Sequence, residues 1–154
     1  MGYGIGVKCR CQEKELILGM GRKFLSIYEE TMNNIRVGKY GVEMRDLVKN
    51  EEYIAVDIEY YAYFCKSCGW VGSLIALDLY KPKDTKKIEQ IIEKYGLLCS
   101  LSDNEDYVLL KEYKHMCPKC RKVMKKTKTD ELFKKICATC GEKYQDSGLI
   151  MYWD

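Results

Sequence analysis

The stretch HMCPKCRKVMKKTKTDELFKKICATCGEKY, residues 115–144, contains four of the nine cysteines of this 154-residue chain. They form two C-x-x-C motifs, Cys117–Cys120 and Cys137–Cys140, separated by 16 residues. A spacing of two residues lets one tight turn direct both sulfurs to the same side, and a hairpin of this length returns the second turn opposite the first. Four thiolates can then surround a metal ion at Zn–S distances of about 2.3 Å. The spacing therefore predicts a four-cysteine zinc site.

Four further cysteines form two pairs nearer the N-terminus, Cys9-x-Cys11 and Cys65-x-x-Cys68. Residues two apart in a regular strand have Cα atoms about 6.6 Å apart, so Cys9 and Cys11 can bind one ion only where the strand bends or bulges. We expect these two pairs to form a second site. A small lobe gains only about 3 to 5 kcal/mol from its core, whereas a structural zinc ion contributes about 10 to 16 kcal/mol, so two Zn²⁺ ions per chain are predicted to hold the lobes folded.

The motifs CPKC and CATCG resemble the two knuckles of the zinc-ribbon superfamily, with Pro118 and Gly141 where ribbon knuckles commonly have proline and glycine. Arg121 departs from this pattern, because glycine is common at its position. The resemblance covers about residues 107–153 and implies a small antiparallel sheet that carries zinc on four cysteines. Residues 1–82, with the motif CKSCG, resemble small uncharacterised bacterial zinc-ribbon proteins that have a helical insertion. Such ribbons occur in proteins of many functions, so the resemblance implies no activity.

The apolar periodicity predicts an α+β protein, and the resemblance of the knuckles implies that it has two zinc-ribbon-like antiparallel lobes. Apolar residues at three- and four-residue steps predict helices over 22–37 and 42–50, inserted in a first lobe at 1–82. A capped amphipathic helix at 83–98 is expected to connect it to a C-terminal ribbon at 99–154. Strands are predicted from period-two patterns and turn signals, at residues 2–9, 13–21, 55–65, 70–80, 107–116, 123–127, 132–136 and 149–153.

The net charge is +3, but the charged residues are unevenly distributed along the chain. Residues 111–135 contain ten Lys/Arg against three Asp/Glu, and the rest of the chain contains 16 against 20. This pattern is typical either of a surface for an anionic partner or of a solvated lysine-rich loop. In the first case Tyr113 and Tyr144 are candidates to stack on bases. The candidate phosphate contacts are Lys119, Arg121, Lys122, Lys125, Lys126 and Lys128.

Four thiolates leave a zinc ion no open position for water or substrate, so we expect a non-catalytic protein with no small-molecule substrate. Its partner is then a protein or a nucleic acid, and the tyrosine-rich strand YYAYF (60–64) is a possible docking edge for a protein. The same ligand set also suits iron, and the knuckles resemble those of rubredoxin, which leaves an electron-transfer protein as the alternative. A thiol-redox role for CPKC would require a following helix, but the pattern there indicates strand, knuckle and strand.

Cys99 and His115 belong to none of the four cysteine pairs. Cys99 fits a small buried apolar position better than a reactive thiol. His115, the single histidine, is a candidate surface residue, metal ligand or donor to a ligating sulfur. The sequence contains no apolar run of 18 residues and does not begin like a signal peptide, so we expect a cytoplasmic protein without a membrane partner.

Overall fold

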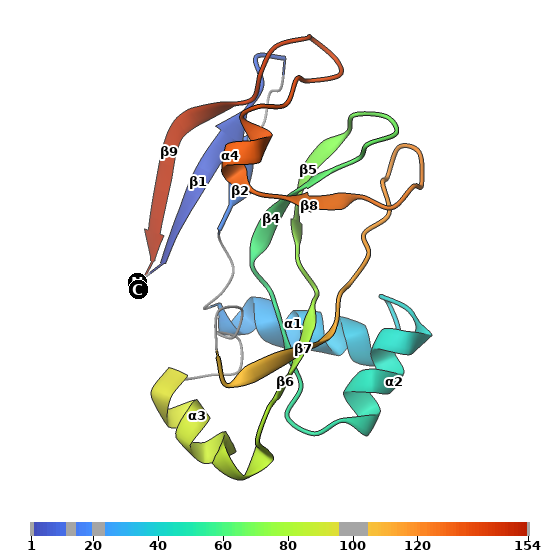
Figure 1. Ribbon diagram of the computed structural model, residues 1–154, viewed down its shortest axis with the longest axis vertical. Helices are drawn as coiled ribbons and strands as arrows, with labels where there is room; N and C mark the ends of the chain where they lie inside the picture. Colours follow the sequence, from blue (N-terminus) through green and yellow to red (C-terminus); the bar gives the residue numbers. More distant parts are fainter. Residues whose placement is uncertain (1, 12–14, 20–23, 96–104, 154) are drawn as a thin grey trace. The chain divides into compact units, whose positions relative to one another are not determined.

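The computed structural model of the chain describes residues 2–11, 15–19, 24–95 and 105–153 (Figure 1). Backbone packing divides the chain into two units, which we call unit 1 (residues 1–20, 59–76 and 114–154) and unit 2 (residues 21–58 and 77–113). The described residues form four α-helices and three antiparallel sheets of three strands each. The predicted α+β class is therefore confirmed.

The first sheet of unit 1 has the strand order β2-β1-β9. Strands β1 (Gly2–Lys8) and β2 (Leu16–Leu18) are antiparallel and flank Cys9 and Cys11, and β9 (Gln145–Trp153) pairs with the other edge of β1. The start of β9 follows the cysteine pair 137/140. The N-terminal hairpin is thus joined to the strand that leaves the last cysteine pair.

The second sheet of unit 1 repeats this construction with the order β5-β4-β8. Strands β4 (Tyr60–Phe64) and β5 (Val71–Ile75) form a hairpin around Cys65 and Cys68, and β8 (Lys125–Thr127) pairs with the other edge of β4. Strand β8 follows the pair 117/120. Because β4 is the central strand, the segment YYAYF has no open edge in this sheet, and its predicted role as a docking edge is wrong.

Glycine allows the close approach of β1 and β9. A Cβ atom on Gly6 would lie 2.3 Å from Ser147 Oγ and 2.8 Å from Leu149 Cβ, which is too close for any side chain. Gly6 is therefore explained by strand pairing, because a larger residue at this position would push the two strands apart.

Two apolar clusters fill unit 1, and each contains cysteine thiols beside hydrophobic side chains. Their buried members are Val7, Cys9, Leu18, Ala62, Val71, Leu132, Cys137 and Tyr144 in one cluster, and Tyr63, Cys65, Cys117 and Met124 in the other.

Unit 2 consists of the sheet β3-β6-β7 with three helices and one 3₁₀ turn. These elements are α1 (Leu25–Arg36), α2 (Val42–Asn50), β3 (Ala55–Val56), β6 (Leu79–Pro82), a 3₁₀ turn (Thr85–Lys87), α3 (Ile88–Tyr95) and β7 (Tyr107–Lys111). The predicted helices at 22–37 and 42–50 are confirmed within the described residues. Helix α1 buries Met32 and Ile35, as its periodicity requires, and is followed by Gly38 at φ +84°.

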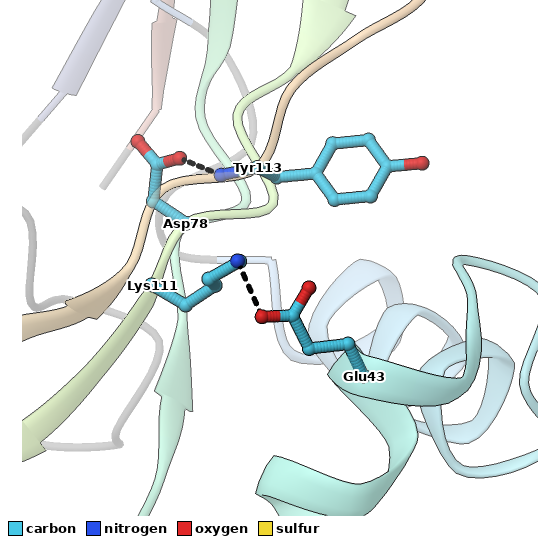
Figure 2. Close-up of polar contacts among 4 residues, drawn as sticks. All are labelled: Glu43, Asp78, Lys111 and Tyr113. Atoms are coloured by element: carbon cyan, nitrogen blue, oxygen red, sulfur yellow. Dashed lines mark hydrogen bonds and ion pairs between the residues drawn. The ribbon is translucent and has the colours of Figure 1, made fainter.

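Polar contacts hold the end of β7 in unit 2 (Figure 2). The buried carboxylate of Asp78 accepts a hydrogen bond from the backbone N–H of Tyr113 at 2.9 Å. Lys111 Nζ lies 2.5 Å from Glu43 Oε1, in the first turn of α2. Tyr113 lies beyond the paired residues of β7, so Asp78 supplies the acceptor for its backbone N–H. This hydrogen bond in turn stabilises the buried carboxylate.

Three predicted strands differ from the structure. The strand at 55–65 is divided into β3 and β4, and the strand at 70–80 into β5 and β6, because the chain between them contains buried Asp57 and Asp78 and Leu77 at φ +63°. Residues 132–136 form no strand. Instead, α4 (Thr129–Leu132) ends there, with two acidic residues in its first turn that favour a helix start.

The two units also differ from the predicted lobes at 1–82 and 99–154. Pairing of β1 with β9, and of β4 with β8, brings chain segments from both expected lobes into unit 1. The described part of the helix expected to connect the lobes, α3, packs Ile88 and Ile91 against Ala55 and Tyr107 within unit 2. None of the helices in the described ranges is both long enough and apolar enough to cross a membrane.

Candidate metal centres

The three C-x-x-C motifs form turns, here called knuckles, with the same backbone conformation. In each, the amide of the first cysteine donates to the carbonyl of the residue five positions later, and the amide four positions later donates back to the first cysteine. At Cys65, for example, the two bonds involve Trp70 O and Gly69 N and measure 2.8 Å each. Backbone N–H groups also reach the sulfurs, as Thr139 N does at 3.4 Å from Cys137 Sγ. Such donors stabilise thiolate over thiol.

Each knuckle requires a left-handed residue directly after its second cysteine. The values of φ are +74° at Gly69, +74° at Gly141 and +59° at Arg121. Arginine at this position keeps the turn but strains it, because a Cβ atom disfavours the left-handed region by about 1 to 2 kcal/mol. The departure seen in the sequence therefore changes the energy of the second knuckle and leaves its shape intact.

The shorter motif at Cys9 and Cys11 lies beyond the end of β1, where the chain turns. The two sulfurs are 3.6 Å apart. The bend that the spacing required is present, so both thiols can face one ion.

Two tetrads of cysteines result. One contains Cys9, Cys11, Cys137 and Cys140, which we call the outer tetrad, and the other contains Cys65, Cys68, Cys117 and Cys120, which we call the inner tetrad; within each, the sulfurs all lie within 4.8 Å of one another. The measured Sγ–Sγ distances of 3.0, 3.6, 3.4 and 3.6 Å approach the value of about 3.8 Å for four sulfurs placed tetrahedrally at Zn–S bond lengths. Both tetrads can therefore hold a metal ion.

The predicted combination of pairs in sequence order is wrong. The sequence suggested that the first two pairs share one ion and the last two share another, whereas the structure nests the inner tetrad within the outer one along the chain. The physical reason is strand pairing. Strand β9 leaves the last knuckle and joins β1, and β8 leaves the second knuckle and joins β4, so each of these knuckles is carried to the hairpin with which its outgoing strand pairs.

The thiols of the inner tetrad do not ionise equally. Burial favours the neutral form of Cys65, but the backbone N–H groups of Cys68 and Ser67 favour the thiolate and lower the pKa of Cys65 to about 6. At Cys120, the Lys122 N–H favours the thiolate, whereas the adjacent Cys65 sulfur and burial raise its pKa to about 12.

The outer tetrad has the same inequality. Burial opposes ionisation of Cys137, but the N–H groups of Cys140 and Thr139 lower its pKa to about 6, and the sulfurs of Cys140 and Cys137 raise the pKa of Cys11 to about 12. In both tetrads, neighbouring sulfurs thus raise the pKa of at least one thiol, so the four thiols do not all ionise easily together. Four thiolates at these distances need a cation between them, which fits the ligand set of a divalent metal.

The two tetrads differ in their access to solvent. Cys11 is exposed, whereas every inner cysteine is buried or half-buried. A cavity of about 470 Å³ lies beside the outer tetrad and is lined by Cys9, Lys8, Arg10, Glu142 and Gln145. The outer site is therefore the more accessible of the two.

The six predicted phosphate-contacting residues lie together in unit 1, on the second knuckle, β8 and the residue after it. Of the six, only Lys126 is half-buried, with its Nζ 4.4 Å from the ring centre of Tyr61. The other five are exposed and form no ion pair with any described residue. The cluster is a positively charged edge of the β5-β4-β8 sheet.

The aromatic candidates are placed differently. Tyr144 is only 3% exposed and belongs to the apolar core, so the prediction that it stacks on bases is wrong. Tyr113 belongs to unit 2, where its ring packs edge-on against Tyr40. His115 is in neither tetrad; its Nε2 lies 2.8 Å from Ile75 O and its ring packs on Tyr63. Cys99 lies outside the described residues.

Sequence reasoning missed Trp70, and considered Tyr61 only within the docking edge YYAYF and not as an aromatic beside the basic edge. Both are half-buried, and both belong to the β4–β5 hairpin around the first inner knuckle. The available signal was the small Gly72, which leaves space for an indole on the same face of β5 two residues from Trp70.

Comparison of the chain with protein-family models, with curated proteins and with solved structures finds no match. The two tetrads are compatible with zinc-ribbon sites through their knuckle geometry alone.

Proposed function

We propose that this chain is a non-catalytic zinc protein that binds nucleic acid through the basic edge of its inner ribbon, by which we mean the β5-β4-β8 sheet with the inner tetrad. The observation that supports this most strongly is the gathering of six basic side chains on one knuckle and the short strand that follows it. The inner tetrad holds both in place, because Cys117 and Cys120 belong to the same knuckle as Lys119, Arg121 and Lys122.

The ligand set supports a structural role for the metal. Four thiolates fill the coordination sphere of Zn²⁺, so the ion organises the protein and has no position for a substrate. The same set binds iron in electron-transfer proteins. Elemental analysis of freshly purified protein separates the two readings: two zinc ions per chain and no visible colour are expected, and a red, iron-containing protein would overturn the structural assignment.

Phosphate binding by the basic edge has a measurable signature. Each neutralised phosphate contributes about −0.9 to the slope of log K against log salt concentration on duplex DNA, so engagement of all six residues gives a slope of about −5. The variant Lys122→Gln/Lys125→Gln is expected to lower the affinity and reduce the slope by about 2.

Lys86→Gln/Lys87→Gln provides the matched control, because it removes the same charge from exposed residues of the 3₁₀ turn in unit 2. Fluorescence anisotropy with a labelled oligonucleotide measures both variants. Equal effects of the two would mean that net charge alone attracts the nucleic acid, and unchanged binding in both would refute the proposal.

A protein-binding adaptor is the second candidate, and β9 favours it. Within the described sheet β9 is an edge strand, and the cross-strand pair Tyr3 and Tyr152 is 66% and 79% exposed, with Ile150 at 51%. Exposed apolar edge strands are sites of strand addition by another chain. A protein ligand whose binding is lost in Tyr152→Lys and is insensitive to salt would support this role over nucleic-acid binding.

A further inference from the structure

One face of the β5-β4-β8 sheet carries a row of aromatic side chains. Tyr63 of β4 lies directly between Gly72 of β5 and Lys126 of β8 in the strand register. The indole of Trp70 covers Gly72, since a Cβ there would be 2.0 Å from the ring. The ammonium group of Lys126 lies 4.4 Å from the centre of the Tyr61 ring. Trp70, Tyr61 and Lys126 therefore share this face.

The opposite face of the same sheet packs on the larger of the two apolar clusters of unit 1. There Ala62 and Val71 are buried with Val7 and Leu132, and Ser73 Oγ donates to Ile17 O. The aromatic face packs on the second cluster, whose buried members are Tyr63, Cys65, Cys117 and Met124.

The aromatic face is only partly covered by this cluster. Tyr63 is buried, its ring contacts His115 and it belongs to the cluster, so it is a packing residue. Tyr61, Trp70 and Leu74 around it are half-buried and uncharged. These three side chains give the face an apolar surface that reaches solvent.

The inner metal centre joins this aromatic face to the basic edge. The carbonyl groups of Trp70 and Lys122 each accept a 2.8 Å hydrogen bond from the backbone N–H of the first cysteine of their knuckle, Cys65 and Cys117 respectively. Trp70 and Lys122 thus occupy equivalent positions in the two knuckles that face one ion. Closing the tetrad brings an indole and a lysine to the same end of the sheet.

We propose that this face binds the unpaired bases of a single-stranded nucleic acid, with Trp70 and Tyr61 stacking on bases and Lys126 and the knuckle lysines contacting phosphates. This inference rests on the proposed nucleic-acid binding and specifies its substrate. Charge and shape together favour this ligand. A polyanion complements the five exposed basic side chains, which form no ion pair with any described residue. Only a single strand presents the faces of its bases to the half-buried aromatic rings.

The test compares a single-stranded oligonucleotide of about 12 nucleotides, within the site size of sheet-based binders, with the duplex of the same sequence. Full-length, metal-loaded protein is used throughout. Tyr61→Leu and Trp70→Leu keep an apolar side chain on the sheet and are each expected to weaken single-strand binding by about tenfold, while duplex binding stays unchanged. Lys122→Gln weakens both. Retention of two metal equivalents shows that each variant is folded around its sites.

Tryptophan fluorescence gives a second measurement that needs no substitution in the aromatic face. In a Trp153→Phe background Trp70 is the single tryptophan, and stacking of a base on the indole is expected to quench its fluorescence with the single strand and not with the duplex. Equal affinity for both nucleic acids, together with parental binding by the two leucine variants, would overturn the stacking face and leave the basic edge standing. Failure of the parent protein to bind either nucleic acid would refute the proposed function itself.

Discussion

Replacing Arg121 with glycine should strengthen the inner metal site. Arg121 adopts φ +59°, where a residue with a Cβ atom is disfavoured by about 1 to 2 kcal/mol. Glycine removes this strain but loses about 0.5 to 1 kcal/mol more conformational entropy on folding. The net gain is about 0.5 to 1 kcal/mol, which corresponds to about a two- to fivefold higher metal affinity.

The two glycines at the equivalent position provide the reverse experiment. Gly141 has φ +74° and no atom within 4 Å of an added Cβ, so Gly141→Ala should cost only the strain, a net loss of about 0.5 to 1 kcal/mol. At Gly69 the added Cβ would lie 2.6 Å from Ala138 Cβ. Because Ala138 has no flexible side chain to move away, the backbone must shift, at a further cost of about 1 to 3 kcal/mol.

Competition with a chromophoric chelator measures the metal affinities of all three variants. The expected order of affinity change is a gain for Arg121→Gly, a small loss for Gly141→Ala in the outer site and a larger loss for Gly69→Ala in the inner site. A weaker inner site in Arg121→Gly would refute the strain argument, because it would mean that the arginine side chain stabilises the knuckle. Equal losses in the two alanine variants would show that the Gly69–Ala138 approach is absent.

Three further results are expected. Limiting chelator should remove metal from the outer tetrad first, because Cys11 is exposed; loss of both metals at one rate in a stopped-flow assay would contradict this difference in access. Gly72→Ala should unfold the inner ribbon or displace the Trp70 ring, seen as a shift in tryptophan emission, whereas an unchanged spectrum would exclude the contact of the indole with Gly72. Asp78→Ala should lower the free energy of unfolding in urea by about 1 to 3 kcal/mol, because the Tyr113 amide loses its buried acceptor. A loss below about 0.5 kcal/mol, like that of a surface ion pair, would mean that this amide is hydrated and does not depend on Asp78.

The parts of the structure that could be predicted from the sequence depend on interactions between residues close together in the chain. Helices α1 and α2 follow from apolar steps of three and four residues. The knuckles follow from cysteine spacing, and even the strained position was visible as Arg121 in place of glycine. Each of these features is decided within about ten residues, where propensity and spacing act directly.

The features that could not be predicted depend on contacts between distant segments. Whether a knuckle shares its metal with its neighbour in sequence or with one far away is decided by the pairing of β1 with β9 and of β4 with β8. The burial of Tyr144 is likewise a consequence of that pairing. At Leu132 two local tendencies compete. The apolar pattern at 132–136 suits a strand, but the two acidic residues in the first turn of α4 favour the helix that forms.

The central claim is that the two metal sites are nested, and proton–cadmium correlation NMR tests it most directly. In protein loaded with a spin-one-half cadmium isotope, each metal resonance is coupled to the β-protons of the cysteines that bind it. The structure predicts two cadmium signals, one coupled to Cys9, Cys11, Cys137 and Cys140 and the other to Cys65, Cys68, Cys117 and Cys120. Couplings that join 9 and 11 with 65 and 68, and 117 and 120 with 137 and 140, would contradict the nested arrangement.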